Sequence, residues 1–151
     1  MNNSKLCFLV LAAALSTAAL SGCNRGPDPA KVREDVAKAQ ADGQKKIADA
    51  QAKLDKANAE AKKDATVDNA NGNANGAPGT PPNGDQKKIA DAQYDLDKAR
   101  AEAAYDVAKA NCEAQTGDAK KSCQDQAKAQ YDSAVAAAKQ KNDQANQRAS
   151  G

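Results

Sequence analysis

The residue types that could do chemistry in this 151-residue chain are few: it has four cysteines and no histidine. Two of the cysteines, Cys112 and Cys123, bracket the segment CEAQTGDAKKSC. Gly117 suits the left-handed C-cap of one helix and Asp118 the N-cap of the next, so the expected turn lies midway between the two cysteines. In an antiparallel helix pair the thiols would face each other. We therefore predict an intramolecular Cys112–Cys123 disulfide, closing a loop of about a dozen residues and contributing roughly 3 kcal/mol.

Three other interpretations of this cysteine pair have less support. A zinc site would need further cysteine or histidine ligands, and the chain has no histidine. A redox-active pair usually has the Cys-x-x-Cys spacing, whereas ten residues separate these two cysteines. An intermolecular disulfide stays open as the alternative.

A third cysteine, Cys23, follows a leader typical of secreted proteins. The first five residues are polar and positively charged, and residues 6–20 form an apolar run that is short for a membrane span. The run ends in Leu20-Ser21-Gly22-Cys23, which resembles the lipobox of bacterial lipoproteins. The resemblance implies that a diacylglyceryl group is added to the Cys23 sulfur, and that cleavage before Cys23 and acylation of its new amino group follow, with palmitate-type chains. An ordinary secretory signal with a chance cysteine is the alternative.

Acylation of Cys23 would make the protein a membrane-anchored one. Each buried CH₂ of an acyl chain contributes about 0.8 kcal/mol, so two or three chains hold a protein permanently. The residue after the cysteine is Asn24, not the aspartate that retains lipoproteins at the inner membrane of enteric bacteria. We therefore expect the protein at the outer membrane, facing the periplasm.

The composition excludes most enzymatic folds. From Cys23 onward the chain has only twelve large apolar residues, so its 40% hydrophobic content is mostly alanine. Such a chain cannot bury the core that an α/β enzyme or a β-sandwich needs. A Ser/His/Asp arrangement is impossible without histidine, and carboxylates on exposed helices lack a pocket to shift their pKa values. We predict no enzyme activity, no cofactor, no metal and no small-molecule substrate.

Charge is balanced along the chain, which argues against nucleic-acid binding. The net charge is +2, and removal of Lys5 with the leader lowers it to +1. Acidic and basic residues alternate instead of forming a basic stripe, and tryptophan is lacking.

Helical spacing also predicts local ion pairs such as Asp42–Lys46 and Lys98–Glu102.

The elements that position the cysteines are predicted to be long alanine-rich helices. The predicted fold class is therefore all-α. Asp28-Pro29 is typical of a helix start, and a narrow apolar stripe with coiled-coil character continues to about residue 65, with Gly43 as a weak point. Asn, Gly and Pro then predict a flexible linker, joining this helix loosely to the rest. The expected parts are a signal peptide 1–22, a tether 23–28, a helix 29–65, a disordered linker 66–84, a helical hairpin 85–147 and a tail 148–151.

An internal repeat relates the first helix to the hairpin. Residues 44–64 align with residues 86–106 at an offset of 42, with 16 of 21 positions identical. Such a repeat is typical of a duplicated helical arm. Within the hairpin, the mirror about Gly117–Asp118 predicts that Tyr105 packs beside Tyr131. Limited proteolysis is expected to cut first between residues 69 and 84.

The hairpin segment resembles uncharacterised alanine-rich periplasmic proteins of proteobacteria, whose composition is similar to the helical stalk of TolA. The whole plan also resembles the murein lipoprotein, but this sequence ends in Arg148-Ala149-Ser150-Gly151 instead of the lysine joined to peptidoglycan. We therefore expect no covalent peptidoglycan bond.

These resemblances imply a non-enzymatic lipoprotein that acts as a periplasmic spacer or interaction arm. Its expected partners are the membrane through Cys23, an envelope protein or peptidoglycan held without a covalent bond, and further helices by self-association. The alternative is a stress-protective, conditionally folded protein resembling the late-embryogenesis-abundant class. Strong helical circular dichroism in dilute buffer would favour the arm, whereas helix gained only on drying would favour the alternative.

Overall fold

The computed structural model describes residues 26–70 and 82–150. These residues form three helices, α1 (Pro29–Ala70), α2 (Asn83–Cys112) and α3 (Gly117–Arg148), and no strand occurs among them. The prediction of an all-α fold is confirmed. Residues 71–81, most of the expected linker, and residues 1–25, which hold the lipobox, lie outside the described part.

Helix α1 begins where the sequence predicts. The Asp28 carboxylate accepts a hydrogen bond from the Ala30 backbone N–H at 2.9 Å, so Asp28 satisfies one of the free donors of the first turn. Pro29 is the first helical residue, where its missing N–H costs nothing. The helix continues to Ala70, five residues beyond the predicted end, because residues 66–70 include no proline or glycine to stop it.

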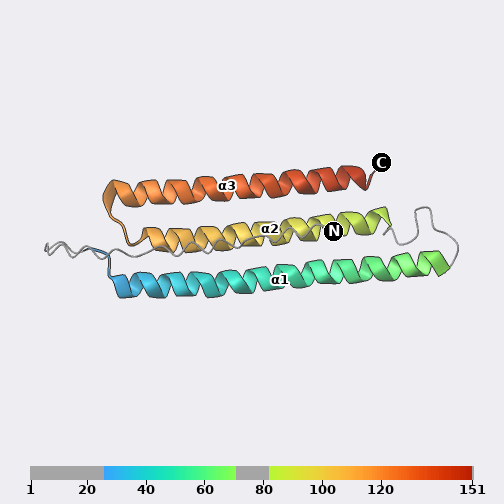
Figure 1. Cartoon of the computed structure of the whole chain (residues 1–151), viewed down its shortest axis with the longest axis horizontal. Helices are drawn as coiled ribbons and strands as arrows, with labels where there is room; N and C mark the ends of the chain where they lie inside the picture. Colours follow the sequence, from blue (N-terminus) through green and yellow to red (C-terminus); the bar gives the residue numbers. More distant parts are fainter. Residues whose placement is uncertain (1–25, 71–81, 151) are drawn as a thin grey trace, which may run out of the picture.

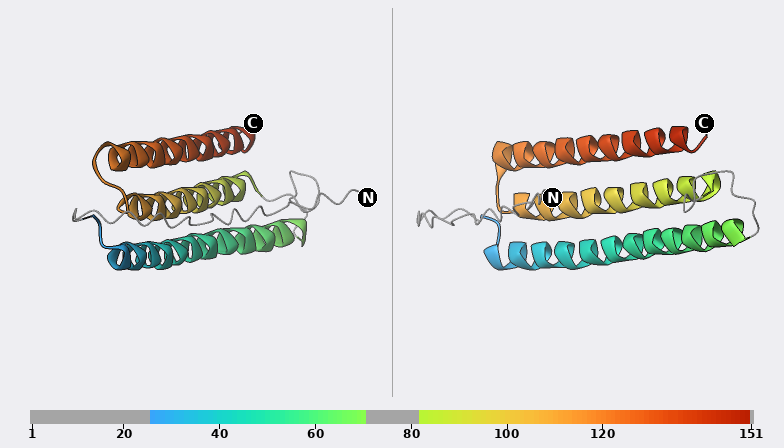
Figure 2. Two further views of the ribbon diagram at one scale, coloured as in Figure 1. Left: turned by 60° about the vertical axis from the view of Figure 1, so that its left-hand side comes forward. Right: turned by 45° about the vertical axis from the view of Figure 1, so that its right-hand side comes forward.

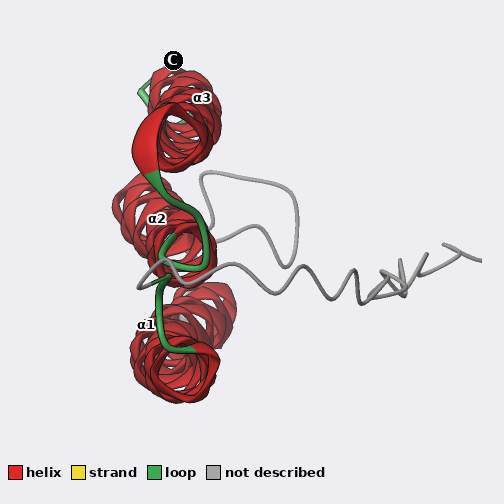
Figure 3. Ribbon diagram, turned by 90° about the vertical axis from the view of Figure 1, so that its left-hand side faces the viewer, coloured by secondary structure: helices red, strands yellow, loops and turns green. Residues whose placement is uncertain are grey.

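The three helices lie antiparallel in one open layer. Helix α2 lies between the other two and packs against both, whereas α1 and α3 do not contact each other. Figure 1 shows the three helices side by side, and the two turned views of Figure 2 show the same order. Seen along the helices, the three axes form a row and not a triangle (Figure 3). Among the described residues, no helix therefore covers either broad face of this layer, and α2 is the one helix with two helical neighbours.

The buried side chains are almost all alanine. Leu54 on α1 and Leu96 on α2 are the large exceptions, with 8% and 2% of their surfaces exposed. They form one apolar cluster with Ala50 and Ala99. Small side chains let the helices approach closely, but each buries little area, so the larger apolar side chains of the α1–α2 seam are these two leucines and the partly buried Ile47 and Ile89 that pack against them.

The position of α1 differs from the expectation of a loosely joined helix. Helix α1 packs along the whole of α2. The physical reason is the internal repeat, because α1 and α2 carry the same apolar stripe and each stripe provides a surface for the other. The stripe, and not the linker, decides whether the helix docks.

Within the described residues, none of the helices is apolar enough over sufficient length to cross a membrane.

Candidate functional site

Two of the three predicted site residues are joined in the structure. The sulfurs of Cys112 and Cys123 are bonded, and the two Cα atoms are 5.7 Å apart. Cys112 is the last residue of α2 and is fully buried, whereas Cys123 lies in the second turn of α3. The disulfide therefore holds the two helices together next to their connection. The third site residue, Cys23, lies outside the described residues.

The turn inside the disulfide loop differs from the predicted one. Helix α2 ends at Cys112 instead of residue 116, and α3 begins at Gly117 with Thr116, not Asp118, as its N-cap. Gly117 does adopt the left-handed conformation, with φ of +57°, but it opens α3 instead of closing α2. The Gly117-Asp118 pair therefore predicted the position of the turn correctly. The prediction of Gly117 as the C-cap of α2 and Asp118 as the N-cap of α3 was wrong, because it rested on local propensity alone.

A polar cluster spans the same turn. Lys120 Nζ donates to Glu113 Oε2 at 2.6 Å, and Gln124 Nε2 donates to Glu113 Oε1 at 3.3 Å. The hydrogen bond from Lys120, together with its positive charge, lowers the pKa of the Glu113 carboxyl below its usual value. Glu113 thus adds a second, non-covalent link between the end of α2 and the start of α3.

The hairpin seam continues from the disulfide through two tyrosines. The rings of Tyr105 and Tyr131 have centroids 5.4 Å apart and are inclined by 37°. They adjoin a shallow groove of about 200 Å³ between α2 and α3, whose other lining residues are mostly alanines. The predicted packing of these tyrosines is confirmed, since the mirror about the turn places them at equivalent heights.

Helices α1 and α2 approach each other closely at Gly43. This glycine is buried, and a Cβ placed on it would lie 2.7 Å from the Cβ of Ala103. Real Cβ atoms do not approach so closely, so only glycine allows the two backbones to meet here. The sequence suggested that Gly43 weakens the helix. In the structure the same residue makes the contact with α2 possible.

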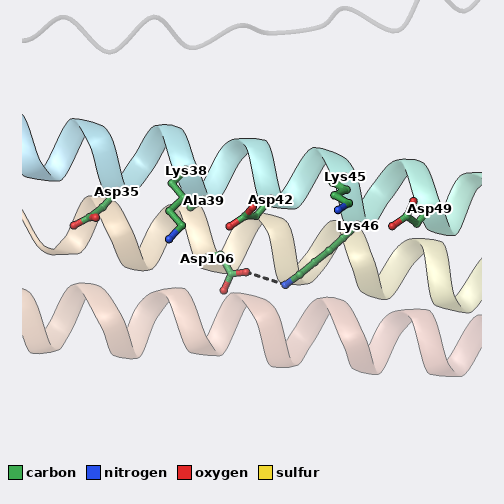
Figure 4. A pocket seen from close by; sticks show the side chains of 8 residues that line it. All are labelled: Asp35, Lys38, Ala39, Asp42, Lys45, Lys46, Asp49 and Asp106. Carbon is green, nitrogen blue, oxygen red and sulfur yellow. Dashed lines mark hydrogen bonds and ion pairs between the residues drawn. The ribbon is translucent and has the colours of Figure 1, made fainter.

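An ion pair lies beside this contact. Lys46 Nζ on α1 is 3.2 Å from Asp106 Oδ2 and 3.9 Å from Glu102 Oε2, both on α2. Figure 4 shows Lys46 reaching across the helix boundary to Asp106. The hydrogen bond and charge of Asp106 raise the pKa of Lys46, and the charge of Asp42 on the same helix adds only a minor increase. The predicted local pair Asp42–Lys46 is thus replaced by a pair between helices, whereas the predicted Lys98–Glu102 pair forms at 3.9 Å.

Charged side chains line the groove around Lys46. The groove has a volume of about 470 Å³ and opens widely to solvent (Figure 4). Aspartates and lysines alternate along it, so it presents no uniform charge to a ligand. Its lining residues are Asp35, Lys38, Ala39, Asp42, Lys45, Lys46, Asp49 and Asp106. In the described residues no group of three or more cysteines or carboxylates is arranged to hold a metal ion.

A buried carboxylate lies at the other end of the α1–α2 seam. Asp85, in the first turn of α2, is only 4% exposed and accepts a hydrogen bond from Lys88 Nζ at 2.8 Å. The hydrogen bond and charge of Asp85 raise the pKa of Lys88, and the charges of Glu60 and Asp64 on α1 raise it further. Acidic residues on both helices therefore raise the pKa of Lys88.

Sequence reasoning missed the contact of Gly43 with Ala103, the buried Asp85 and the Lys46–Asp106 pair. The signal that could have found the pair is the repeat itself, which makes two near-identical stripes available to each other. Comparison of the chain with protein-family models, curated proteins and solved structures found no match.

Proposed function

We propose that the protein is a lipid-anchored lipoprotein of the bacterial cell envelope, which acts as a non-enzymatic helical spacer or interaction arm. The observation that carries this proposal is the lipobox-like sequence Leu20-Ser21-Gly22-Cys23 placed directly before a long helix. Helix α1 starts at Pro29, six residues after the cysteine that would carry the acyl chains.

The arrangement of the helices supports an arm that projects from the membrane. The start of α1 lies at the same end of the layer as the α2–α3 turn and its disulfide (Figure 1). An anchor at Cys23 would therefore hold this end near the bilayer. The end of α1, the start of α2 and the end of α3 would lie far from it. At 1.5 Å per residue, the 42 residues of α1 span about 63 Å.

The open layer supports interaction more than catalysis. Charges of both signs line the groove around Lys46, and alanines line most of the groove beside the tyrosines. The three described helices lie in a row, so no helix among them covers either broad face (Figure 3). Long exposed helices of this kind suit contact with an elongated partner, such as an envelope protein, a further helix or peptidoglycan bound without a covalent bond.

The test is substitution of the lipobox cysteine. We expect Cys23→Ser to give uncleaved precursor or soluble protein instead of a mature, outer-membrane form, as measured by fractionation and intact mass. Cys7→Ser is the matched control, because it removes a cysteine from the same leader but outside the lipobox, and it should fractionate like the native protein. A Cys23→Ser protein that still sedimented fully with the outer membrane would contradict the proposal.

A further inference from the structure

The α1–α2 seam has an internal two-fold relation that follows from the repeat. At the offset of 42, Leu54 on α1 corresponds to Leu96 on α2, and both lie in the same buried cluster. Because the helices are antiparallel, equivalent residues meet at the centre of the seam. A two-fold axis between these leucines relates one helix to the other.

The charges on the seam follow the same relation. Lys46 on α1 faces Glu102 and Asp106 on α2. The residue equivalent to Lys46 is Lys88, and the residues equivalent to this acidic pair are Glu60 and Asp64. Those are the two α1 carboxylates whose charges raise the pKa of Lys88. The sequence therefore repeats the charge pattern of the seam, but the ion pairs differ, because Lys46 pairs with Asp106 across the seam at 3.2 Å whereas Lys88 pairs with Asp85 of its own helix at 2.8 Å.

The buried alanines repeat the relation as well. Ala103, which packs against Gly43, is equivalent to Ala61, and these two alanines are 8% and 1% exposed. The two stripes differ at the position of Gly43, where α2 has Asp85, and at Asn58 and Lys62, where α2 has Arg100 and Ala104. Around the leucine cluster, α1 and α2 present nearly the same surface to each other.

A surface of this kind does not distinguish its own chain from a second copy. An interface between two copies that share one patch is the usual basis of symmetric dimers, and exchange of an identical element is a low-cost route to them. Among the three described helices, α1 contacts α2 and not α3, so it can leave without disturbing the α2–α3 hairpin, which the disulfide holds. The twelve residues 71–82 that connect the helices in the sequence are enough to span about 40 Å if fully extended.

We propose that α1 is an exchangeable arm, and that the α1–α2 seam forms between two copies of this chain as well as within one. This inference deepens the proposed function, on which it rests, by naming a second copy of the chain as a partner of the arm. In the exchanged dimer, α1 of each copy lies on α2 of the other, and every contact of the seam is kept.

The test uses two variants that are each mismatched alone but matched together. The first variant carries Gly43→Ala and Lys46→Glu, so its α1 collides with Ala103 and repels Asp106 of its own chain. The second carries Ala103→Gly and Asp106→Lys, which leaves a gap and a repulsion of opposite sign. In a mixed exchanged dimer, one seam has both sets of substitutions and the other has none, so neither seam has the collision at position 103 or the repulsion at position 106.

Both full-length variants are purified with their acyl chains in detergent, one of them isotope-labelled, and are unfolded and refolded together. We expect native mass spectrometry to show a dimer with one copy of each, at least tenfold above the dimer of either variant alone. Mixing should also restore helical circular dichroism if either variant folds poorly by itself. A chain with all four substitutions is the matched control, since its own seam is complementary and it should remain mainly monomeric.

Absence of the mixed dimer, together with no gain in helix on mixing, would overturn the exchange. That result would leave the anchored arm intact, because membrane attachment is measured separately with Cys23→Ser. Loss of membrane attachment, in turn, would not prevent the mixed dimer from forming in detergent.

Discussion

Replacement of Gly43 by alanine separates the effect of local helix propensity from the effect of helix packing. In an exposed helix, Gly→Ala stabilises by about 1 kcal/mol, because alanine loses less backbone freedom on folding. At Gly43 the new Cβ would lie 2.7 Å from the Cβ of Ala103, so one of the helices must shift. Overpacking of this kind costs about 1–3 kcal/mol. We therefore expect Gly43→Ala to reduce the free energy of unfolding by up to about 2 kcal/mol.

The assay is thermal or urea unfolding followed by circular dichroism, with two controls. Gly84 in the first turn of α2 has nothing within 4 Å of an added Cβ, so Gly84→Ala should be neutral or stabilising. Adding Ala103→Gly to Gly43→Ala removes the collision, and a double-mutant cycle should give a coupling of about 1 kcal/mol or more. A Gly43→Ala protein as stable as Gly84→Ala, with no coupling to position 103, would refute the close approach of α1 and α2.

Three further perturbations test the disulfide, the turn and the apolar seam. Reduction or Cys112→Ser should lower the midpoint of the helical melt by roughly 10 °C, from the loss of about 3 kcal/mol of loop-closure stabilisation, and identical melts would contradict this. The lowered pKa of Glu113 means that its link to Lys120 stabilises fully above the usual carboxyl pKa and is lost as the pH falls through the lowered value. Melts at a series of pH values should therefore show less acid sensitivity in Glu113→Gln. Leu96→Ala should lower the free energy of unfolding by about 2–5 kcal/mol, as measured in urea, because Leu96 is buried in the α1–α2 seam. Val135 is half-exposed on α3, so Val135→Ala should lower it by less than about 1.5 kcal/mol. Equal losses in the two variants would argue against the packing of the seam.

Features that depend on neighbours in sequence could be predicted without the structure. Asp28 and Pro29 predict the start of α1 because an N-cap acts within its own first turn. The pairing of Tyr105 with Tyr131 follows from a short hairpin, since a nearby turn restricts the register. The alanine-rich composition similarly indicates helices without a deep core.

Features that depend on residues far apart in sequence were missed. Gly43 and Ala103 are sixty positions apart, and local propensity describes only the cost of a glycine inside a helix. Lys46 has a suitable acidic neighbour one turn away, so its pairing with Asp106 across the seam appears only when α1 is placed on α2. The end of α2 at Cys112 reflects a loop held by the disulfide and by Glu113, neither of which helix propensity includes.

The proposed function requires that the protein is anchored at one end of its helical layer and projects from the membrane. It is tested most directly by measuring the height of two points on α1 above the bilayer. Lys31 and Lys62 are both exposed, and at 1.5 Å per residue they are about 47 Å apart along the helix. Each is replaced by a labelled cysteine in the acylated protein, which is reconstituted in vesicles containing an energy acceptor in their headgroups. We predict efficient transfer from position 31 and weak transfer from position 62. Equal transfer from both positions, or recovery of the protein free of the vesicles, would contradict the account.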